Sequence, residues 1–240
     1  MLARVSNIEA YRRWLTWAPY FEGQEEPTMD DLVRQITVDE PSEAMMAGTA
    51  FHAAIEKAAY GTHETFEAKG YRFILPDAEI ALPEVRELRG YKDYGPLTVT
   101  GKVDCIEGKV VIDHKTTGRP DLERYLEGCQ WRFYLDIFDA EVFRWHVFEI
   151  KEVEDKTYEV KAPHTLEMRR YPELGADCTR LAREFHEFAN RVGLPDSRLE
   201  DAASGMLNST EFERLPQDVQ INLCTEYSEA DIAVREAFAS

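Results

Sequence analysis

The fold is decided by residues 99–115, which read Val99-Thr100-Gly101-Lys102-Val103-Asp104-Cys105-Ile106-Glu107-Gly108-Lys109-Val110-Val111-Ile112-Asp113-His114-Lys115. Apolar and polar side chains alternate on both sides of Glu107-Gly108. Alternation with a period of two is typical of strands, and a short interruption containing Gly is typical of a hairpin turn. The stretch therefore predicts a two-stranded antiparallel hairpin with Glu107 and Gly108 as its loop.

This loop fixes a register, in which Ile106 faces Lys109, Asp104 faces Val111 and Lys102 faces Asp113. Opposed residues of an antiparallel pair point to the same side. One face then carries Asp104, Asp113 and Lys115, and the other carries Val103, Cys105, Val110 and Ile112. A slip of one residue would put the two carboxylates on opposite faces, and the apolar pattern argues against that slip.

Two carboxylates on diagonal positions of neighbouring strands can lean onto one hard cation. A metal held in this way lowers the pKa of bound water and polarises a phosphoryl oxygen, and a nearby lysine can orient the water or neutralise developing charge. The hairpin alone is equally compatible with a surface ribbon whose charges only solvate the sheet.

Two further segments favour the functional interpretation. Gly48 to Glu56 is rich in alanine, has helical periodicity and contains His52. Asp121 to Asp139 predicts a second helix, with Asp121 as N-cap after Pro120, and with Gln130 and Tyr134 four residues apart beside its apolar stripe. Alone, each of these three side chains would be an ordinary helix residue.

Four motifs occur in order: Gly-x-x-x-His at 48–52, Gly-x-x-Asp at 101–104, Asp-x-Lys-Thr at 113–116 and Gln-x-x-x-Tyr at 130–134. Together they resemble the RecB-type branch of the PD-(D/E)xK nuclease superfamily, and the run Arg4-Val5-Ser6-Asn7-Ile8 is similar to phage or prophage exonucleases of this branch. The resemblance covers about residues 45–150. It implies an α/β fold: a central mixed sheet flanked by helices, the restriction-endonuclease-like nuclease core, with extra N- and C-terminal helices.

The resemblance also implies roles. The expected metal ligands are the side chains of His52, Asp104 and Asp113 and the main-chain carbonyl of His114. The expected catalytic lysine is Lys115. A histidine among oxygen ligands shifts the preference from Mg²⁺ toward Mn²⁺ without excluding either.

Gln130 and Tyr134 match the helix motif that positions the substrate or the active-site core. The implied activity is metal-dependent hydrolysis of DNA, as an exonuclease acting on linear DNA with free ends in phage recombination, repair or end processing. A recombination or annealing protein is a possible partner. The sequence encodes neither the polarity nor the choice between single and double strands.

The cysteines do not predict an iron-sulfur cluster. Some nucleases of this branch bind one through four cysteines, one upstream of the nuclease motifs and three close together near the C-terminus. The four cysteines here have another spacing, with none before His52: Cys105, Cys129, Cys178 and Cys224. Cys105 on the apolar hairpin face and Cys129 on the helix stripe are expected to be reduced core residues of a cytosolic protein. No P-loop or helicase motif is present in the sequence.

Composition sets the frame for these expectations. At 240 residues and 44% hydrophobic content, the chain can bury the core of one domain. No stretch of about 18 uninterrupted apolar residues is present and the N-terminus lacks an apolar central region, so we expect a cytoplasmic protein of a bacterial or phage-infected cell, without a membrane partner.

The net charge of −18 argues against DNA binding, because a polyanion is repelled at long range. However, residues 101–135 hold six basic and six acidic groups, whereas residues 196–240 hold three and ten. Candidate phosphate contacts, each of which alone could be a solvated charge, are Lys102, Arg119, Arg124 and Arg132. An alternative is a catalytically silent nuclease-like module that inhibits a partner or mimics DNA.

Periodicity extends the prediction along the chain. Gly193-Leu194-Pro195 is the expected boundary between a nuclease domain over residues 1–195 and an acidic helical appendage over 196–240. Helices are predicted over 7–20, 30–36, 121–139, 165–192 and 217–238, and strands over 71–75, 79–82, 85–91, 97–106, 109–115, 143–151 and 157–160.

Overall fold

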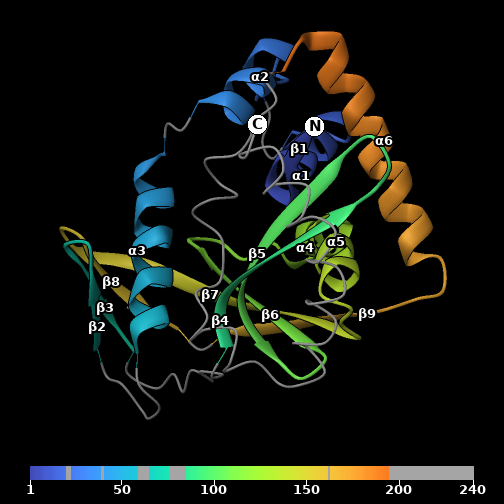
Figure 1. Ribbon diagram of the computed structural model, residues 1–240. Helices are drawn as coiled ribbons and strands as arrows, with labels where there is room; N and C mark the ends of the chain where they lie inside the picture. Colours follow the sequence, from blue (N-terminus) through green and yellow to red (C-terminus); the bar gives the residue numbers. More distant parts are fainter. Residues whose placement is uncertain (20–22, 39–40, 59–64, 76–84, 162, 195–240) are drawn as a thin grey trace, which may run out of the picture. The chain divides into compact units, whose positions relative to one another are not determined.

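The computed structural model describes residues 1–19, 23–38, 41–58, 65–75, 85–161 and 163–194 (Figure 1). The chain divides into two units, 1–198 and 199–240, and all the described residues belong to the first. The predicted appendage over 196–240, the helix over 217–238 and the strand over 79–82 lie outside the described residues, so they stay predictions.

The described residues form a mixed α/β fold. Its helices are α1 (Val5–Leu15), α2 (Met29–Thr37), α3 (Glu43–Lys57), α4 (Leu122–Glu127), α5 (Gln130–Ile137) and α6 (Leu174–Val192). Its strands are β1 (Leu2–Arg4), β2 (Thr65–Ala68), β3 (Tyr71–Ile74), β4 (Val85–Asp93), β5 (Thr98–Glu107), β6 (Val110–Thr117), β7 (Val142–Glu154), β8 (Thr157–Val160) and β9 (His164–Arg169).

The strands make one sheet in the order β1-β5-β6-β7-β8-β3-β2, with β4 also paired to β5 and β9 also paired to β7. The β1–β5, β6–β7 and β3–β8 pairs are parallel, and the other pairs are antiparallel. The predicted fold class, a central mixed sheet flanked by helices, is confirmed.

Helices lie against both faces of this sheet. Along β7 the Phe143 ring packs on Tyr134 of α5, with ring centroids 5.7 Å apart, whereas Phe148 packs on Phe51 of α3 at 5.0 Å. Residues 143 and 148 differ by an odd number, so they point to opposite faces of the strand. In Figure 1, α3 accordingly lies over β2 and β3, away from α4, α5 and α6.

Strand β5 changes partner along one of its edges. It pairs with β4 from Thr98 to Ile106. At one end, residues 98–100 also pair with β1, and at the other end residues 105–107 pair with β6. Because β4 occupies one edge, β1 and β6 must share the other edge. Residues 101–104 lie between these two pairings, and we call this stretch the fork.

The hairpin register differs from the prediction by two residues. Glu107 pairs with Val110 and Cys105 with Ile112, so the loop is Gly108-Lys109 and not Glu107-Gly108. Gly108 has φ of 55°, a positive value that Gly adopts without steric cost at the first position of a tight loop. A shift of two residues leaves every side chain on its predicted face. If the pairing is continued by one residue beyond Cys105 and Ile112, Asp104 lies opposite Asp113.

Two predicted helices are wrong in part. The helix over 121–139 is two helices, α4 and α5, separated at Gly128-Cys129. Residues 164–169, read as the start of a long helix, form β9 on the edge of β7, and only 174–192 are helical. Tertiary pairing has overridden the local helical spacing there. Strands β1 and β2 were not predicted.

Most of the other predicted elements agree closely with the structure, but the helix predicted over 7–20 is α1, which begins at Val5 and ends at Leu15. Asp121 caps α4 and accepts a hydrogen bond from the main-chain N–H of Arg124 at 3.5 Å. The Ala-rich helix is α3, in which Ala47, Ala50 and Phe51 are buried. Among the described residues, none of the helices has the length and apolar character needed to cross a membrane.

Candidate active site

Asp104 occupies the fork. Its Oδ2 accepts the main-chain N–H of His114 at 2.6 Å, so the side chain joins β5 to β6 where the backbone ladder has ended. Its Oδ1 lies 3.2 Å from Nδ1 of His52, which comes from α3. The two residues are partly accessible, with side chains 14% and 28% exposed. The structure thus brings two of the predicted ligands into contact.

Asp113 lies across the fork from Asp104 and is buried, with 2% of the residue exposed. Gln130 donates its side-chain amide to Asp113 Oδ1 at 3.2 Å. Lys115 Nζ lies 2.6 Å from Asp113 Oδ2. Asp113, Lys115 and Gln130 therefore form one connected group at the start of α5.

Helix α5 is held close to the fork by Tyr134. The Tyr134 hydroxyl donates to the main-chain oxygen of Lys102 at 3.0 Å. A Cβ on Gly101 would lie only 2.4 Å from Cε1 of this ring, so the close approach requires glycine at position 101. Gly48 plays a similar part on the other face, where a Cβ would lie 3.0 Å from the Thr116 hydroxyl. The glycines of both predicted motifs thus allow a helix to approach the strands.

The two carboxylates differ in acidity. Burial raises the pKa of Asp104, but the hydrogen bond and charge of His52 and the charge of Lys115 outweigh it and hold this pKa well below the usual range. Burial raises the pKa of Asp113 to about 6, and Asp104 adds to the shift against the opposing charge of Lys115. Asp104 is the firmly ionised acid of the pair.

The basic groups stay protonated more readily than usual. Burial lowers the pKa of Lys115, but the charges of Asp113 and Asp104 more than offset this and raise it, so the side chain is an ammonium ion at neutral pH. Burial likewise lowers the pKa of His52, and the hydrogen bond and charge of Asp104 raise it above its ordinary value. The site combines two acids with the Lys115 ammonium and an imidazole that is protonated more readily than usual.

His114 contributes its backbone and not its ring to this arrangement. Its side chain is 1% exposed, and burial lowers its pKa to about 3, so the ring is neutral. The ring lies 5.6 Å from the His146 ring and 5.9 Å from the Phe148 ring, measured between centroids. Its main-chain N–H donates to Asp104, as described above.

The donor types at the fork suit a divalent cation. Carboxylates, a main-chain carbonyl and one imidazole are ligands of Mg²⁺ and Mn²⁺. Asp113 Oδ2 is buried without a hydrogen bond and has only the ion pair with Lys115 to compensate it. Within the described residues, however, no group of three His, Cys, Asp or Glu side chains is arranged so that it could hold a metal ion. The ligand set therefore stays a prediction.

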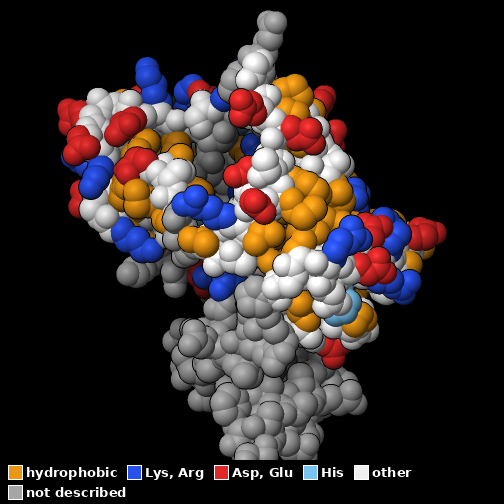
Figure 2. All heavy atoms as spheres, turned by 90° about the horizontal axis from the view of Figure 1, so that it is seen from above, with side chains coloured by type: hydrophobic (Ala, Val, Ile, Leu, Met, Phe, Trp, Pro, Cys, Tyr) orange, Lys and Arg blue, Asp and Glu red, His pale blue; other side chains and the backbone are white. Residues whose placement is uncertain are grey.

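The candidate phosphate contacts have internal partners. Lys102 pairs with Glu87, and Arg132 donates to the main-chain oxygen of Gly128 at 2.7 Å while its guanidinium lies 4.3 Å from the centre of the Trp131 ring. Arg119 is exposed in the turn after β6. Figure 2 shows basic and acidic side chains interspersed on one face of the molecule, not gathered by sign.

Glu9 is a residue that the sequence analysis missed. It is 7% exposed on α1, and its Oε2 accepts the main-chain N–H groups of Cys129 at 2.6 Å and Gln130 at 3.0 Å. These are orphan donors at the start of α5, which a carboxylate satisfies well. A signal existed in the sequence, because Glu9 falls on the same helix face as the buried Val5 and Ile8.

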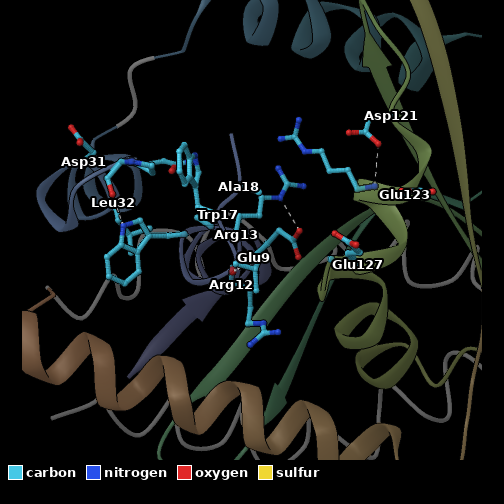
Figure 3. A pocket seen from close by; sticks show the side chains of 17 residues that line it. Glu9, Arg12, Arg13, Trp17, Ala18, Asp31, Leu32, Asp121, Glu123 and Glu127 are labelled. Atoms are coloured by element: carbon cyan, nitrogen blue, oxygen red, sulfur yellow. Dashed lines mark hydrogen bonds and ion pairs between the residues drawn. The ribbon is translucent and has the colours of Figure 1, made fainter. Parts of the chain in front are cut away.

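A pocket of about 390 Å³ lies between α1, α2 and α4 (Figure 3). Glu9 and Gly128 line it, and Arg13 pairs with Glu9 inside it at 2.9 Å. Arg124 is the one candidate phosphate contact among its lining residues. None of the predicted metal ligands lines this pocket, so it is separate from the fork.

The cysteines in the described residues lie in the core. Cys105, Cys129 and Cys178 are buried and free. Burial raises the pKa of the Cys105 thiol to about 12. Cys224 lies outside the described residues.

No family model matches the sequence, and no curated protein matches it. Two solved structures are distantly similar to this chain. LHK-Exo in complex with dAMP is 14% identical over 80% of this chain and 93% of that one, with a TM-score of 0.35. SSO0001 is 21% identical over 44% of this chain, which spans about half (50%) of the length of SSO0001, with a TM-score of 0.32. Likenesses this distant assign neither a site nor an activity.

Proposed function

We propose that this chain is a divalent-metal-dependent DNA nuclease that hydrolyses phosphodiester bonds at the fork of β5. The proposal is supported by two contacting groups on the strands that border the fork: Asp104 with His52, and Asp113 with Lys115 and Gln130. Clustered charges of this kind cost stability and are typical of functional sites.

The metal would be held by the side chains of His52, Asp104 and Asp113 and by the main-chain carbonyl of His114. When bound, a divalent cation supplies an activated water and stabilises charge on the phosphate. Asp113 is suited to ligation because its buried carboxylate is incompletely compensated, as its raised pKa indicates.

Lys115 acts as a cation in this proposal. Its raised pKa keeps the ammonium charged at neutral pH, so it is unsuited to act as a general base. An ammonium next to the scissile phosphate can orient the attacking water and neutralise the charge that develops in the transition state. Gln130 keeps Asp113 in place, and Tyr134 holds α5 against the backbone of β5.

The finer assignment follows the resemblance of the four motifs to RecB-type nucleases. It is an exonuclease that acts on linear DNA with free ends, in phage recombination, repair or end processing in the cytoplasm of a bacterial or phage-infected cell. A recombination or annealing protein is the proposed partner. Bound cations would offset locally the net charge of −18.

The test uses the purified chain with end-labelled linear DNA and covalently closed circular DNA, in Mn²⁺, Mg²⁺ or EDTA. We expect cleavage that requires the metal and favours the linear substrate. Asp113→Asn and Lys115→Ala should each lower the rate by about 10²–10³-fold, the effect of removing one preorganised charge. The matched controls are Asp139→Asn and Lys109→Ala. In the wild type, Asp139 and Lys109 form an ion pair at 2.7 Å next to the hairpin loop.

Cleavage that persists in EDTA, or that survives both site substitutions at the rate of the controls, would contradict the proposal. Absence of cleavage with every metal, together with tight binding to a nuclease or another DNA-binding protein, would favour the silent DNA-mimicking module instead. Preference for circular over linear DNA would remove only the exonuclease assignment.

A further inference from the structure

The start of α5 is held by a carboxylate from α1, 120 residues from Cys129 in the sequence. Glu9 Oε2 accepts two successive main-chain N–H groups, those of Cys129 and Gln130, and no side chain of α5 or its N-cap residue caps this helix. Arg13 Nε donates to the other oxygen at 2.9 Å. Burial raises the pKa of Glu9, but Arg13 and the hydrogen bonds to Cys129 lower it overall, so the carboxylate is ionised at neutral pH.

Gly128 makes room for this contact. A Cβ at position 128 would lie 2.6 Å from Glu9 Oε1 and 3.2 Å from Glu9 Cδ. Gly128 has φ of −60° and ψ of 164°, values that any residue adopts, so only the carboxylate excludes a larger residue. The break between α4 and α5 thus occurs where Glu9 enters.

The contact leads directly to the fork. Gln130, whose main-chain N–H is held by Glu9, donates its side-chain amide to Asp113 Oδ1. One residue therefore has its backbone fixed by α1 and its side chain fixed on a proposed metal ligand. Groups that orient a ligand from outside the first coordination shell commonly change metal affinity or activity by 10–100-fold when removed.

We infer that Glu9 is a positioning residue of the active site, which sets the place of Gln130 and through it the orientation of Asp113. The inference rests on the proposed function for its catalytic meaning. It assigns to α1 a part in the site that none of the four motifs includes.

The experiment is a double-mutant cycle on Mn²⁺ affinity, measured by calorimetry without DNA, with four proteins: wild type, Glu9→Gln, Gln130→Ala and the double variant. If Glu9 acts through Gln130, Glu9→Gln should weaken Mn²⁺ binding by about 10-fold in the wild-type background and by less than about 2-fold in the Gln130→Ala background. Deuterium exchange of the amides in residues 128–134 should become faster in Glu9→Gln.

A second substitution protects the test if Glu9→Gln does not fold. Gly128→Ala leaves the carboxylate intact and displaces it, so it should reproduce the loss of Mn²⁺ affinity. Gly175→Ala in α6 is the matched control, because the new Cβ would lie 3.8 Å from Asp136, which is an ordinary van der Waals distance. It should bind Mn²⁺ as the wild type does.

Equal losses in both backgrounds, or unchanged Mn²⁺ affinity in both Glu9→Gln and Gly128→Ala, would overturn the inference and leave Glu9 with a purely structural role. A wild-type chain that binds no Mn²⁺ would overturn the proposed function, and the exchange rates would then still decide whether Glu9 holds the start of α5. The two failures are therefore distinguishable.

Discussion

The carboxylate of Asp104 takes the place of a backbone hydrogen bond to His114. Its Oδ2 accepts the main-chain N–H of His114 at 2.6 Å, one step beyond the last pair between β5 and β6. The acid therefore has two tasks, since it completes the sheet and it faces His52 in the proposed site.

The structural task can be tested by Asp104→Asn. This substitution keeps an oxygen acceptor but turns a hydrogen bond to a charged group, worth about 1.5–3 kcal/mol, into a neutral one, worth about 0.5–1.5 kcal/mol. We therefore expect a loss of about 1 kcal/mol in the free energy of unfolding at pH 7, measured by urea denaturation. Asp121→Asn is the control, because Asn caps a helix as well as Asp and Asp121 is exposed. Equal stability of the two variants would refute the structural task.

Metal binding should stabilise the folded chain. At a Mn²⁺ concentration about 100 times the dissociation constant, the free energy of unfolding should rise by about 2.7 kcal/mol and should fall again in excess EDTA. Asp113→Asn should lose this gain and Asp139→Asn should keep it, because only the first is a proposed ligand. The same gain in all three proteins would mean that Mn²⁺ binds elsewhere.

Gly101→Ala should destabilise the chain. The new Cβ would meet Cε1 of Tyr134 at 2.4 Å, and that ring is 6% exposed and tied to the Lys102 carbonyl. Overpacking of this kind costs about 1–3 kcal/mol. Gly118→Ala is the control, since no atom lies within 4 Å of its Cβ, and its midpoint in urea should match that of the wild type. A Gly101→Ala chain as stable as this control would show that α5 can move away from β5 without cost.

The stabilising effect of Glu9 should depend on pH. The pKa of Glu9 is lowered in the folded state, so its contribution is complete above the ordinary value of 4.5 and is lost as the pH falls through the folded-state pKa. Glu9→Gln should therefore cost about 1.5–3 kcal/mol at pH 7, and the difference from wild type should shrink below pH 4.5. Urea titrations at stepped pH measure this.

The exposed Glu123→Gln on α4 is the control for that series and should follow the wild type at every pH. A difference between Glu9→Gln and wild type that stays constant with pH would show that the loss is one of packing and not of charge.

The side-chain faces of the hairpin could be predicted although its loop could not. Moving the loop from Glu107-Gly108 to Gly108-Lys109 changes the register by two, and the period of a strand is two. Gly108 does not decide between the loops from sequence, because both contain it; in the structure it takes the first loop position with a positive φ. With either loop, the alternation of apolar and polar residues in the two strands is the same.

The break in the predicted helix over 121–139 could not be predicted from the sequence of that segment alone. It depends on Glu9, which is 120 residues from Cys129 in sequence and occupies the space next to Gly128. The strand β9 was missed for a related reason, since its pairing with β7 is a tertiary contact and not a property of residues 164–169. The elements that carry the predicted site residues were predictable because they have clear periodicity, whereas the site and the roles of its residues stay predictions.

The change of partners along β5 leaves residues 101–104 without a neighbouring strand on one edge. The Lys102 carbonyl is accordingly satisfied by the hydroxyl of Tyr134, and the His114 amide by the acid of Asp104. The Asp104 side chain at the fork thus serves both the sheet and the proposed site. A sequence that closed the fork with ordinary strand pairing would gain a more regular sheet, but backbone would then take the place of the Asp104 carboxylate as the partner of the His114 N–H.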